Sequence, residues 1–149
     1  MSVGAMNMKT LIVYDSKRGS TEQICKWIAE LLSNDVDIRR VSEVSGLEKY
    51  DLIVVGSPIY MEKPLNSVLN FLRDNKDKLK EKKVILFAVG LATFKFVASR
   101  YLKKMRKALG FQPLLEETLP GKWGLIDRMD RRKVEDFVEK IKKTILGKS

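Results

Sequence analysis

Short apolar, β-branched runs alternate along this chain with longer segments whose apolar residues recur at helical spacing. The clearest runs are 10–14, 52–55 and 84–89. Buried strands of a parallel sheet have this continuous apolar character, because both of their faces are covered. Weaker strands are predicted at 36–41 and within 111–119. Five strands separated by helices predict an α/β three-layer sandwich built from right-handed βαβ crossovers, with a parallel sheet of order 2-1-3-4-5.

Four helices are predicted between and after these strands. The first begins at Ser20, where Gln23 three residues later completes a capping-box pattern. Pro64 is predicted in the first turn of the second helix, where its missing N–H costs little. The third helix is expected to end at Gly110. The last helix buries a stripe of apolar side chains: Val134, Phe137, Val138, Ile141 and Ile145.

Length and composition fit one globular domain. The chain has 149 residues, of which 44% are hydrophobic and 32% charged. We expect a single domain over 9–149, preceded at 1–8 by an N-terminal extension or cloning remnant without the pattern of a secretory signal. No apolar run approaches the ~20 residues that a membrane-spanning helix needs.

The cysteine and histidine counts limit which disulfides, catalytic bases and metal sites the chain can have. A single cysteine, Cys25, cannot form an internal disulfide, which favours a reducing cytoplasm, and we expect it to be buried. Histidine is absent, which excludes an imidazole base and disfavours a His/Cys zinc site, so no metal site is expected. The expected location is the cytoplasm, with peripheral attachment to the inner face of the membrane as an option.

The charge is strongly basic, with 29 Lys and Arg against 19 Asp and Glu, a net charge of +10. Such a surface favours an anionic membrane, an acidic protein or a carboxylate substrate, although solvated lysine-rich helix faces would also explain it. Nucleic acid is not expected as a partner, because the basic residues lack interleaved exposed aromatic residues or a known binding motif.

The loop after the first strand has the residues of an anion site. It reads Ser16, Lys17, Arg18, Gly19, Ser20 and Thr21, and its last two residues begin the predicted helix. Helix N-termini bind phosphate through free N–H groups, glycine allows close approach, and hydroxyl groups donate further bonds. The spacing is neither that of a P-loop nor that of a dinucleotide-binding G-x-G-x-x-G. An ordinary capped helix with turn residues before it is the alternative.

The loop after the central strand offers flat and soft apolar groups. It runs through 56–64 and contains Ile59, Tyr60 and Met61. These side chains suit stacking against an aromatic ring system at the carboxyl edge of the sheet. The alternative is that Tyr60 is simply a packed aromatic residue.

Together these loops resemble the flavodoxin-domain family, in which the first segment binds the phosphate of FMN. The likeness lies in residues 14–24 and 56–60, and Arg18 departs from it where a hydroxyl residue is usual. The chain is also similar to the branch that contains the flavodoxin-type, menaquinone-dependent protoporphyrinogen dehydrogenases. That branch has a basic residue at the position of Lys17, and further likeness lies in three short segments, 109–113, 120–122 and 126–129. The long fifth-strand insertion of the bacterial enzymes is not seen.

The resemblance implies FMN as cofactor, with phosphate contacts from Ser16, Lys17, Arg18, Gly19, Ser20 and Thr21. It implies isoalloxazine contacts from the loops after the third and fourth strands: Ser57, Pro58, Ile59, Tyr60, Met61, Leu91, Ala92, Thr93 and Phe94. Trp123 and Phe94 are alternative candidates for a second stacking face.

The function that the resemblance implies is an FMN-dependent oxidoreductase, in which flavin N5 accepts a hydride or electrons and no side chain is catalytic. Its substrate would be a small reductant or a porphyrinogen, attracted by a basic rim of Lys95, Arg100, Lys122 and Arg128. The alternatives are a non-catalytic electron carrier that docks on an acidic protein, and a domain that has lost its flavin and acts as a basic binding module. A receiver domain shares the strand order but requires an aspartate where Gly56 and Ser57 stand.

Overall fold

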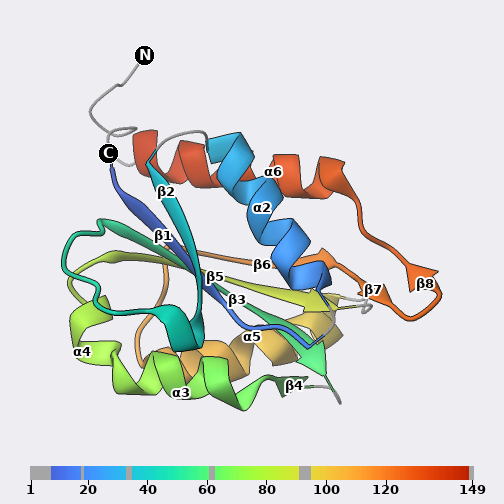
Figure 1. Cartoon of the computed structure of the whole chain (residues 1–149), viewed down its shortest axis with the longest axis horizontal. Coiled ribbons are helices and arrows are strands. Elements are labelled where there is room, and N and C mark those ends of the chain that lie inside the picture. Colours follow the sequence, from blue (N-terminus) through green and yellow to red (C-terminus); the bar gives the residue numbers. More distant parts are fainter. Residues whose placement is uncertain (1–7, 18, 33–34, 61–62, 91–94, 148–149) are drawn as a thin grey trace.

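The computed structural model describes residues 8–17, 19–32, 35–60, 63–90 and 95–147. Its central sheet has five parallel strands in the spatial order β2-β1-β3-β5-β6, which confirms the predicted 2-1-3-4-5 arrangement (Figure 1). The strands are β1 (Thr10–Tyr14), β2 (Val36–Arg40), β3 (Leu52–Tyr60), β5 (Lys83–Gly90) and β6 (Leu115–Pro120).

Helices cover both faces of this sheet and make a three-layer sandwich. One face is covered by α2 (Ser20–Leu32) and α6 (Arg131–Leu146), which pack against each other. The opposite face is covered by α3 (Asn66–Asp74) and α5 (Lys95–Leu109). Two short helical segments, η1 (Val41–Glu43) and α4 (Lys76–Leu79), complete the described helices. Within the described residues, no helix combines the length and apolarity needed to cross a membrane.

Each face of the sheet carries its own apolar core. On the α2 and α6 side, the rings of Phe87 and Phe137 lie 5.9 Å apart and both are fully buried. Cys25 belongs to the same core and is 0% exposed, as expected from the sequence. Met8, which the sequence places in the N-terminal extension, packs against this core as well.

The third strand and the helix after it differ from the sequence prediction. β3 continues past its apolar run as far as Tyr60 and pairs antiparallel with β4 (Lys63–Pro64). Pro64 therefore lies in a strand and not in the first turn of α3, which begins at Asn66. The physical reason is a buried hydroxyl: Ser57 Oγ accepts a hydrogen bond of 2.9 Å from the N–H of Leu65, which keeps this segment extended beside β3.

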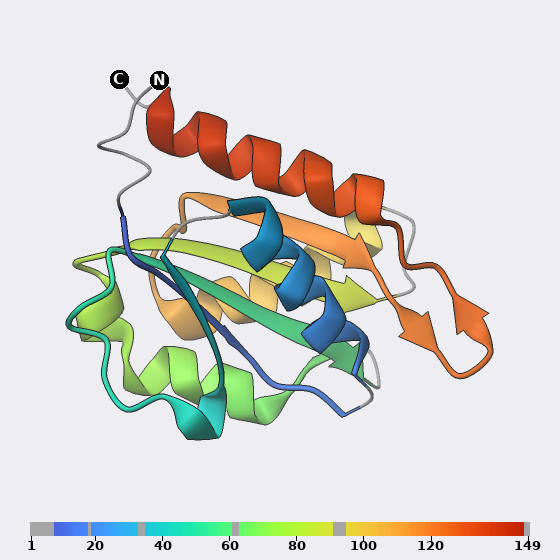
Figure 2. The same ribbon diagram turned by 45° about the horizontal axis from the view of Figure 1, so that its top comes forward.

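A small hairpin that the sequence did not predict follows β6. It consists of β7 (Lys122–Trp123) and β8 (Ile126–Asp127), joined by a two-residue turn in which Gly124 has φ +58°. Its base is fixed by two backbone hydrogen bonds, from Gly121 N–H to the carbonyl of Gly90 and from Arg128 N–H to the carbonyl of Gly121. The hairpin projects from the carboxyl edge of the sheet, away from the sandwich (Figure 2).

Candidate functional site

The carboxyl ends of β1 and β3 form the place where a ligand is expected. The two strands are neighbours in the sheet, but the chain leaves β1 for α2 on one face and β3 for α3 on the other. Such a topological switch point opens a crevice between the outgoing loops. Here it contains a hollow of about 440 Å³, lined by Asp15, Ser16, Lys17, Lys63, Pro64, Leu65, Asn66 and Ser67.

Gly19 ends the loop between β1 and α2, of which the structure describes residues 15–17 and 19. The hydroxyl of Ser16 accepts a hydrogen bond of 2.8 Å from the N–H of Gly19, which closes the loop. Gly19 has φ +96°, a left-handed conformation that glycine adopts without strain. The carbonyl of Gly19 accepts the first helical bond, 3.1 Å from the N–H of Gln23. Gly19 is thus the N-cap, and the capping-box prediction was one residue late at Ser20.

Thr21, in the first turn of α2, carries the strongest evidence for a ligand. Its side chain is 0% exposed, yet its Oγ1 has no hydrogen-bond partner among the described residues. A buried hydroxyl without a partner costs about 1–3 kcal/mol, so native structures rarely keep one without a purpose. The first turn also presents backbone N–H groups that have no acceptor within the helix. A hydroxyl and N–H groups gathered at a helix N-terminus fit a phosphate group.

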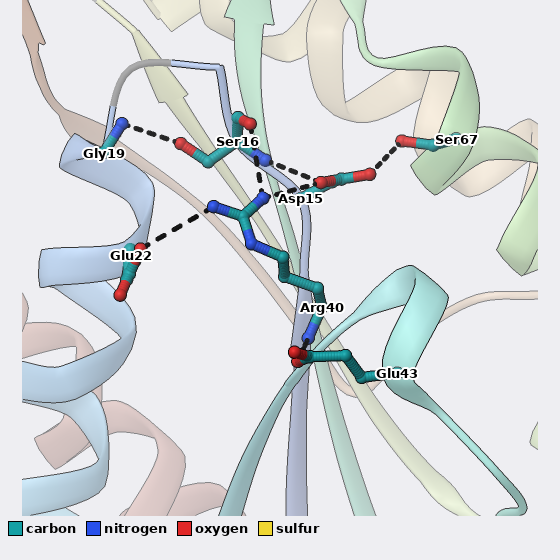
Figure 3. A network of polar contacts seen from close by, with 7 residues as sticks. All are labelled: Asp15, Ser16, Gly19, Glu22, Arg40, Glu43 and Ser67. Atoms are coloured by element: carbon teal, nitrogen blue, oxygen red, sulfur yellow. Dashed lines mark hydrogen bonds and ion pairs between the residues drawn. The ribbon is translucent and has the colours of Figure 1, made fainter.

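An ion-pair network holds this loop against its neighbours (Figure 3). Asp15 Oδ1 accepts hydrogen bonds of 3.0 Å from the N–H of Ser16 and from Arg40 Nη1, while Asp15 Oδ2 accepts one of 2.7 Å from the hydroxyl of Ser67. These contacts join the end of β1 to the end of β2 and to the start of α3. The network therefore fixes where the loop begins relative to both faces of the sheet.

Arg40 is the cation of this network. Its Nη2 lies 3.7 Å from Glu22 Oε1, so one guanidinium serves two carboxylates on either side of the loop. It also lies over the ring of Tyr14, 5.2 Å from the ring centroid, and burial raises the pKa of that phenol. Neither Arg40 nor the role of Asp15 is predicted from the sequence. The signal was the parallel register, which pairs Tyr14 with Arg40 at the ends of adjacent strands.

The hydroxyl of Ser57, in β3, is hydrogen-bonded to the backbone of Pro58 and of Leu65, the residue before α3. This side chain is 0% exposed. Its hydroxyl donates a hydrogen bond of 2.9 Å to the carbonyl of Pro58 and accepts one from the N–H of Leu65. Ile59 is half-buried and packs against the α3 and α5 core, beside Gly90. The hydroxyl of Ser57 is thus used within the protein, and the predicted flavin contacts from this loop stay predictions.

The remaining predicted site residues are only partly described. Arg18, Met61, Leu91, Ala92, Thr93 and Phe94 lie outside the described residues. The backbones of Tyr60 and Trp123 lie in β3 and β7. The base of the hairpin lies beside the start of α2: a Cβ placed on Gly121 would lie 3.3 Å from Ser20 Oγ. Of the basic rim, Lys95 is the first residue of α5, and the other three side chains are exposed: Arg100, Lys122 and Arg128.

Comparison with known proteins agrees with this geometry. A family model described as a flavodoxin domain matches residues 11–144. An uncharacterised protein of Methanocaldococcus jannaschii is 38% identical over 120 residues, which cover 76% of each chain. A flavodoxin of Maridesulfovibrio salexigens is 33% identical over 93 residues, which cover 55% of this chain and 63% of that protein.

The fold is also that of solved structures. A flavoprotein from Lactobacillus acidophilus, solved in complex with FMN, superposes with a TM-score of 0.62 at 17% identity, over 74% of this chain and 93% of that one. These findings support the expected cofactor, FMN, and they leave the protoporphyrinogen dehydrogenase branch without confirmation. Because the family model matches residues 11–144, which is well over half of the chain, the chain belongs to the flavodoxin-domain family.

Proposed function

We propose that the chain is an FMN-binding redox protein whose flavin phosphate is held by residues 16–21, which we call the phosphate loop. The observation that carries this proposal is the unpartnered buried hydroxyl of Thr21 beside a left-handed Gly19 at the start of α2. Membership of the flavodoxin-domain family and the FMN complex of the L. acidophilus flavoprotein support it.

Bound FMN would supply the chemistry, which is transfer of a hydride or of electrons at N5. The chain supplies position and electrostatics. The first turn of α2 and the hydroxyl of Thr21 bind the phosphate, and the exposed Lys17 adds a positive charge beside it. The Asp15–Arg40 network holds the loop in place before the cofactor arrives, so little ordering free energy is lost on binding.

The test compares two buried hydroxyls that lack a partner among the described residues. Thr21 lies in the phosphate loop, and Thr118 lies in β6. We expect Thr21→Val to weaken FMN binding about ten- to hundredfold, because a hydrogen bond to a charged group contributes ~1.5–3 kcal/mol. The stability of the FMN-free protein should stay the same or rise, since the substitution removes a hydroxyl without a partner. Flavin fluorescence quenching and thermal unfolding measure the two effects.

Thr118→Val is the matched control and should leave FMN affinity unchanged. If the wild type retains no flavin after desalting with excess FMN, and quenches no flavin fluorescence on titration, the proposal is wrong. An equal loss of affinity in both variants would also contradict it, because the effect would then not be specific to the loop.

The finer function that we propose is an oxidoreductase of the protoporphyrinogen dehydrogenase type. It is supported by the likeness at Lys17 and at 109–113, 120–122 and 126–129, and by exposed cations near the carboxyl edge that would attract propionate groups. Anaerobic addition of protoporphyrinogen should bleach the visible band of the FMN-loaded protein. Repeated turnover with an artificial electron acceptor should follow.

An electron carrier that docks on an acidic protein is the second candidate. It is favoured by a row of exposed basic side chains on α5, none of which forms an ion pair among the described residues: Arg100, Lys103, Lys104 and Lys107. A carrier exchanges electrons with a protein partner and shows no turnover of a small substrate. Sustained oxidation of protoporphyrinogen would exclude the carrier, and its absence would exclude the dehydrogenase.

A further inference from the structure

The tip of the β7–β8 hairpin exposes large apolar side chains. Leu125, in the turn, is 104% exposed, and Ile126, the first residue of β8, is 49% exposed. The hairpin stands clear of the sandwich, so these side chains have no part in either core (Figure 2). An apolar tip held on a projecting hairpin is costly in water, which points to a partner at this place.

The chain around this tip is basic. Residues 121–133 contain five basic and two acidic side chains. Both carboxylates are used locally, because Asp127 accepts from the N–H of Met129 and Asp130 from that of Arg132, each at 3.0 Å. Arg131 forms an ion pair with Glu30, with 3.1 Å between Nη1 and Oε1. The other four cations are exposed and form no ion pair among the described residues: Lys122, Arg128, Arg132 and Lys133.

We propose that this hairpin docks the chain on an anionic lipid surface. Leu125 and Ile126 would enter the headgroup region, while the four cations would face the lipid phosphates. A convex apolar tip with positive charges on its hairpin and in the following helix turn matches such a surface, because lipid accepts a protruding side chain without a preformed pocket. The net charge of +10 adds attraction over a longer range.

Docking would also orient the molecule. The base of the hairpin lies beside the phosphate loop, since a Cβ added to Gly121 would come within 3.3 Å of Ser20 Oγ. The N–H of Gly121 also donates a hydrogen bond to the carbonyl of Gly90 at the end of β5. The carboxyl edge of the sheet would therefore face the membrane, and α4 at the other end of the sheet would face away from it (Figure 1). The proposal does not depend on bound flavin, so its failure would leave the proposed function standing.

The experiment is flotation of the full-length protein with vesicles of phosphatidylcholine alone and with vesicles that also contain phosphatidylglycerol. We expect binding to the anionic vesicles and a decrease in binding at high salt. The double variant Leu125→Ser, Ile126→Ser should reduce partitioning at least ~tenfold, from the loss of apolar burial. The variant Lys122→Gln, Arg128→Gln should reduce it about ten- to thirtyfold, from the loss of two phosphate contacts.

Matched control variants remove the same kinds of side chain, cationic and apolar, elsewhere on the surface. Lys78→Gln with Lys80→Gln removes two exposed lysines in and next to α4, and Leu146→Ser removes an exposed leucine at the end of α6. Both should bind like the wild type, and circular dichroism should show all variants folded. The proposal is overturned if the wild type does not bind anionic vesicles, if the neutral vesicles bind it equally well, or if the control variants lose as much binding as the hairpin variants.

Discussion

Arg40 shows how one side chain sets the charge at the phosphate loop. Its guanidinium lies 3.0 Å from Asp15 and 3.7 Å from Glu22. Arg40→Gln leaves both carboxylates without this cation next to the bound phosphate. We expect FMN affinity to fall by about three- to tenfold at low ionic strength and by less at high salt, because these partly exposed charges are screened. Riboflavin, which lacks the phosphate, should bind the variant as it binds the wild type.

Two further variants isolate the effect of the Arg40 charge on FMN affinity. Arg131→Gln removes another partly exposed arginine, one that pairs with Glu30 on the outer surface of α2, and should leave FMN affinity unchanged. Asp15→Asn combined with Arg40→Gln removes one of the two carboxylates and should recover part of the lost affinity. A decrease in riboflavin affinity as large as the decrease for FMN would show that Arg40 acts on loop structure and not through charge.

Close contact between β3 and β5 depends on Gly56. A Cβ at this position would lie 2.1 Å from the ring of Phe87, its direct neighbour in the sheet. Phe87 is fully buried and packs on Phe137, so the ring can move aside only by disturbing this packing. We expect Gly56→Ala to reduce the free energy of unfolding by about 2–3 kcal/mol, at the upper end of the cost of overpacking.

Denaturant titration measures this cost, and a double variant tests its cause. With Phe87→Leu in the background, the added methyl group gains space, and the cost of Gly56→Ala should fall below about 1 kcal/mol. An equal cost in both backgrounds would place the strain in the backbone of β3. The sequence pattern does not reveal this contact, because Gly56 reads there as the end of a strand.

The difference between local sequence pattern and contacts between distant residues explains which elements the sequence predicts. Strands such as 10–14 and 84–89 are apolar on both faces, and local pattern alone identifies them. The extension of β3 to Tyr60 and the position of Pro64 depend on a hydrogen bond between Ser57 and Leu65, which are eight residues apart. Arg40 and Asp15 come together only through sheet register, across 25 residues. Pattern gives the layers and their order, whereas contacts between distant residues set the geometry of the site.

At the scale of the whole molecule, Cys25 connects the site to global stability. The thiol is 0% exposed in the core between α2 and α6, and burial raises its pKa above the ordinary range, so it is protonated and protected in the folded chain. It is also the only cysteine. Labelling by a thiol reagent therefore requires unfolding, and FMN at a hundred times its Kd should slow it about a hundredfold by mass action.

The Thr21→Val variant sharpens this measurement. At the same FMN concentration it should label faster than the wild type, by up to the factor by which its affinity is lower, once each rate is divided by the rate of the same protein without FMN. Thr21 and Cys25 lie one turn apart on α2, so a local opening of this helix would expose both. Slow labelling that FMN leaves unchanged, in a protein that demonstrably holds the flavin, would mean that α2 opens past Cys25 while the phosphate loop stays closed. The site would then be more stable than the helix on which it is built.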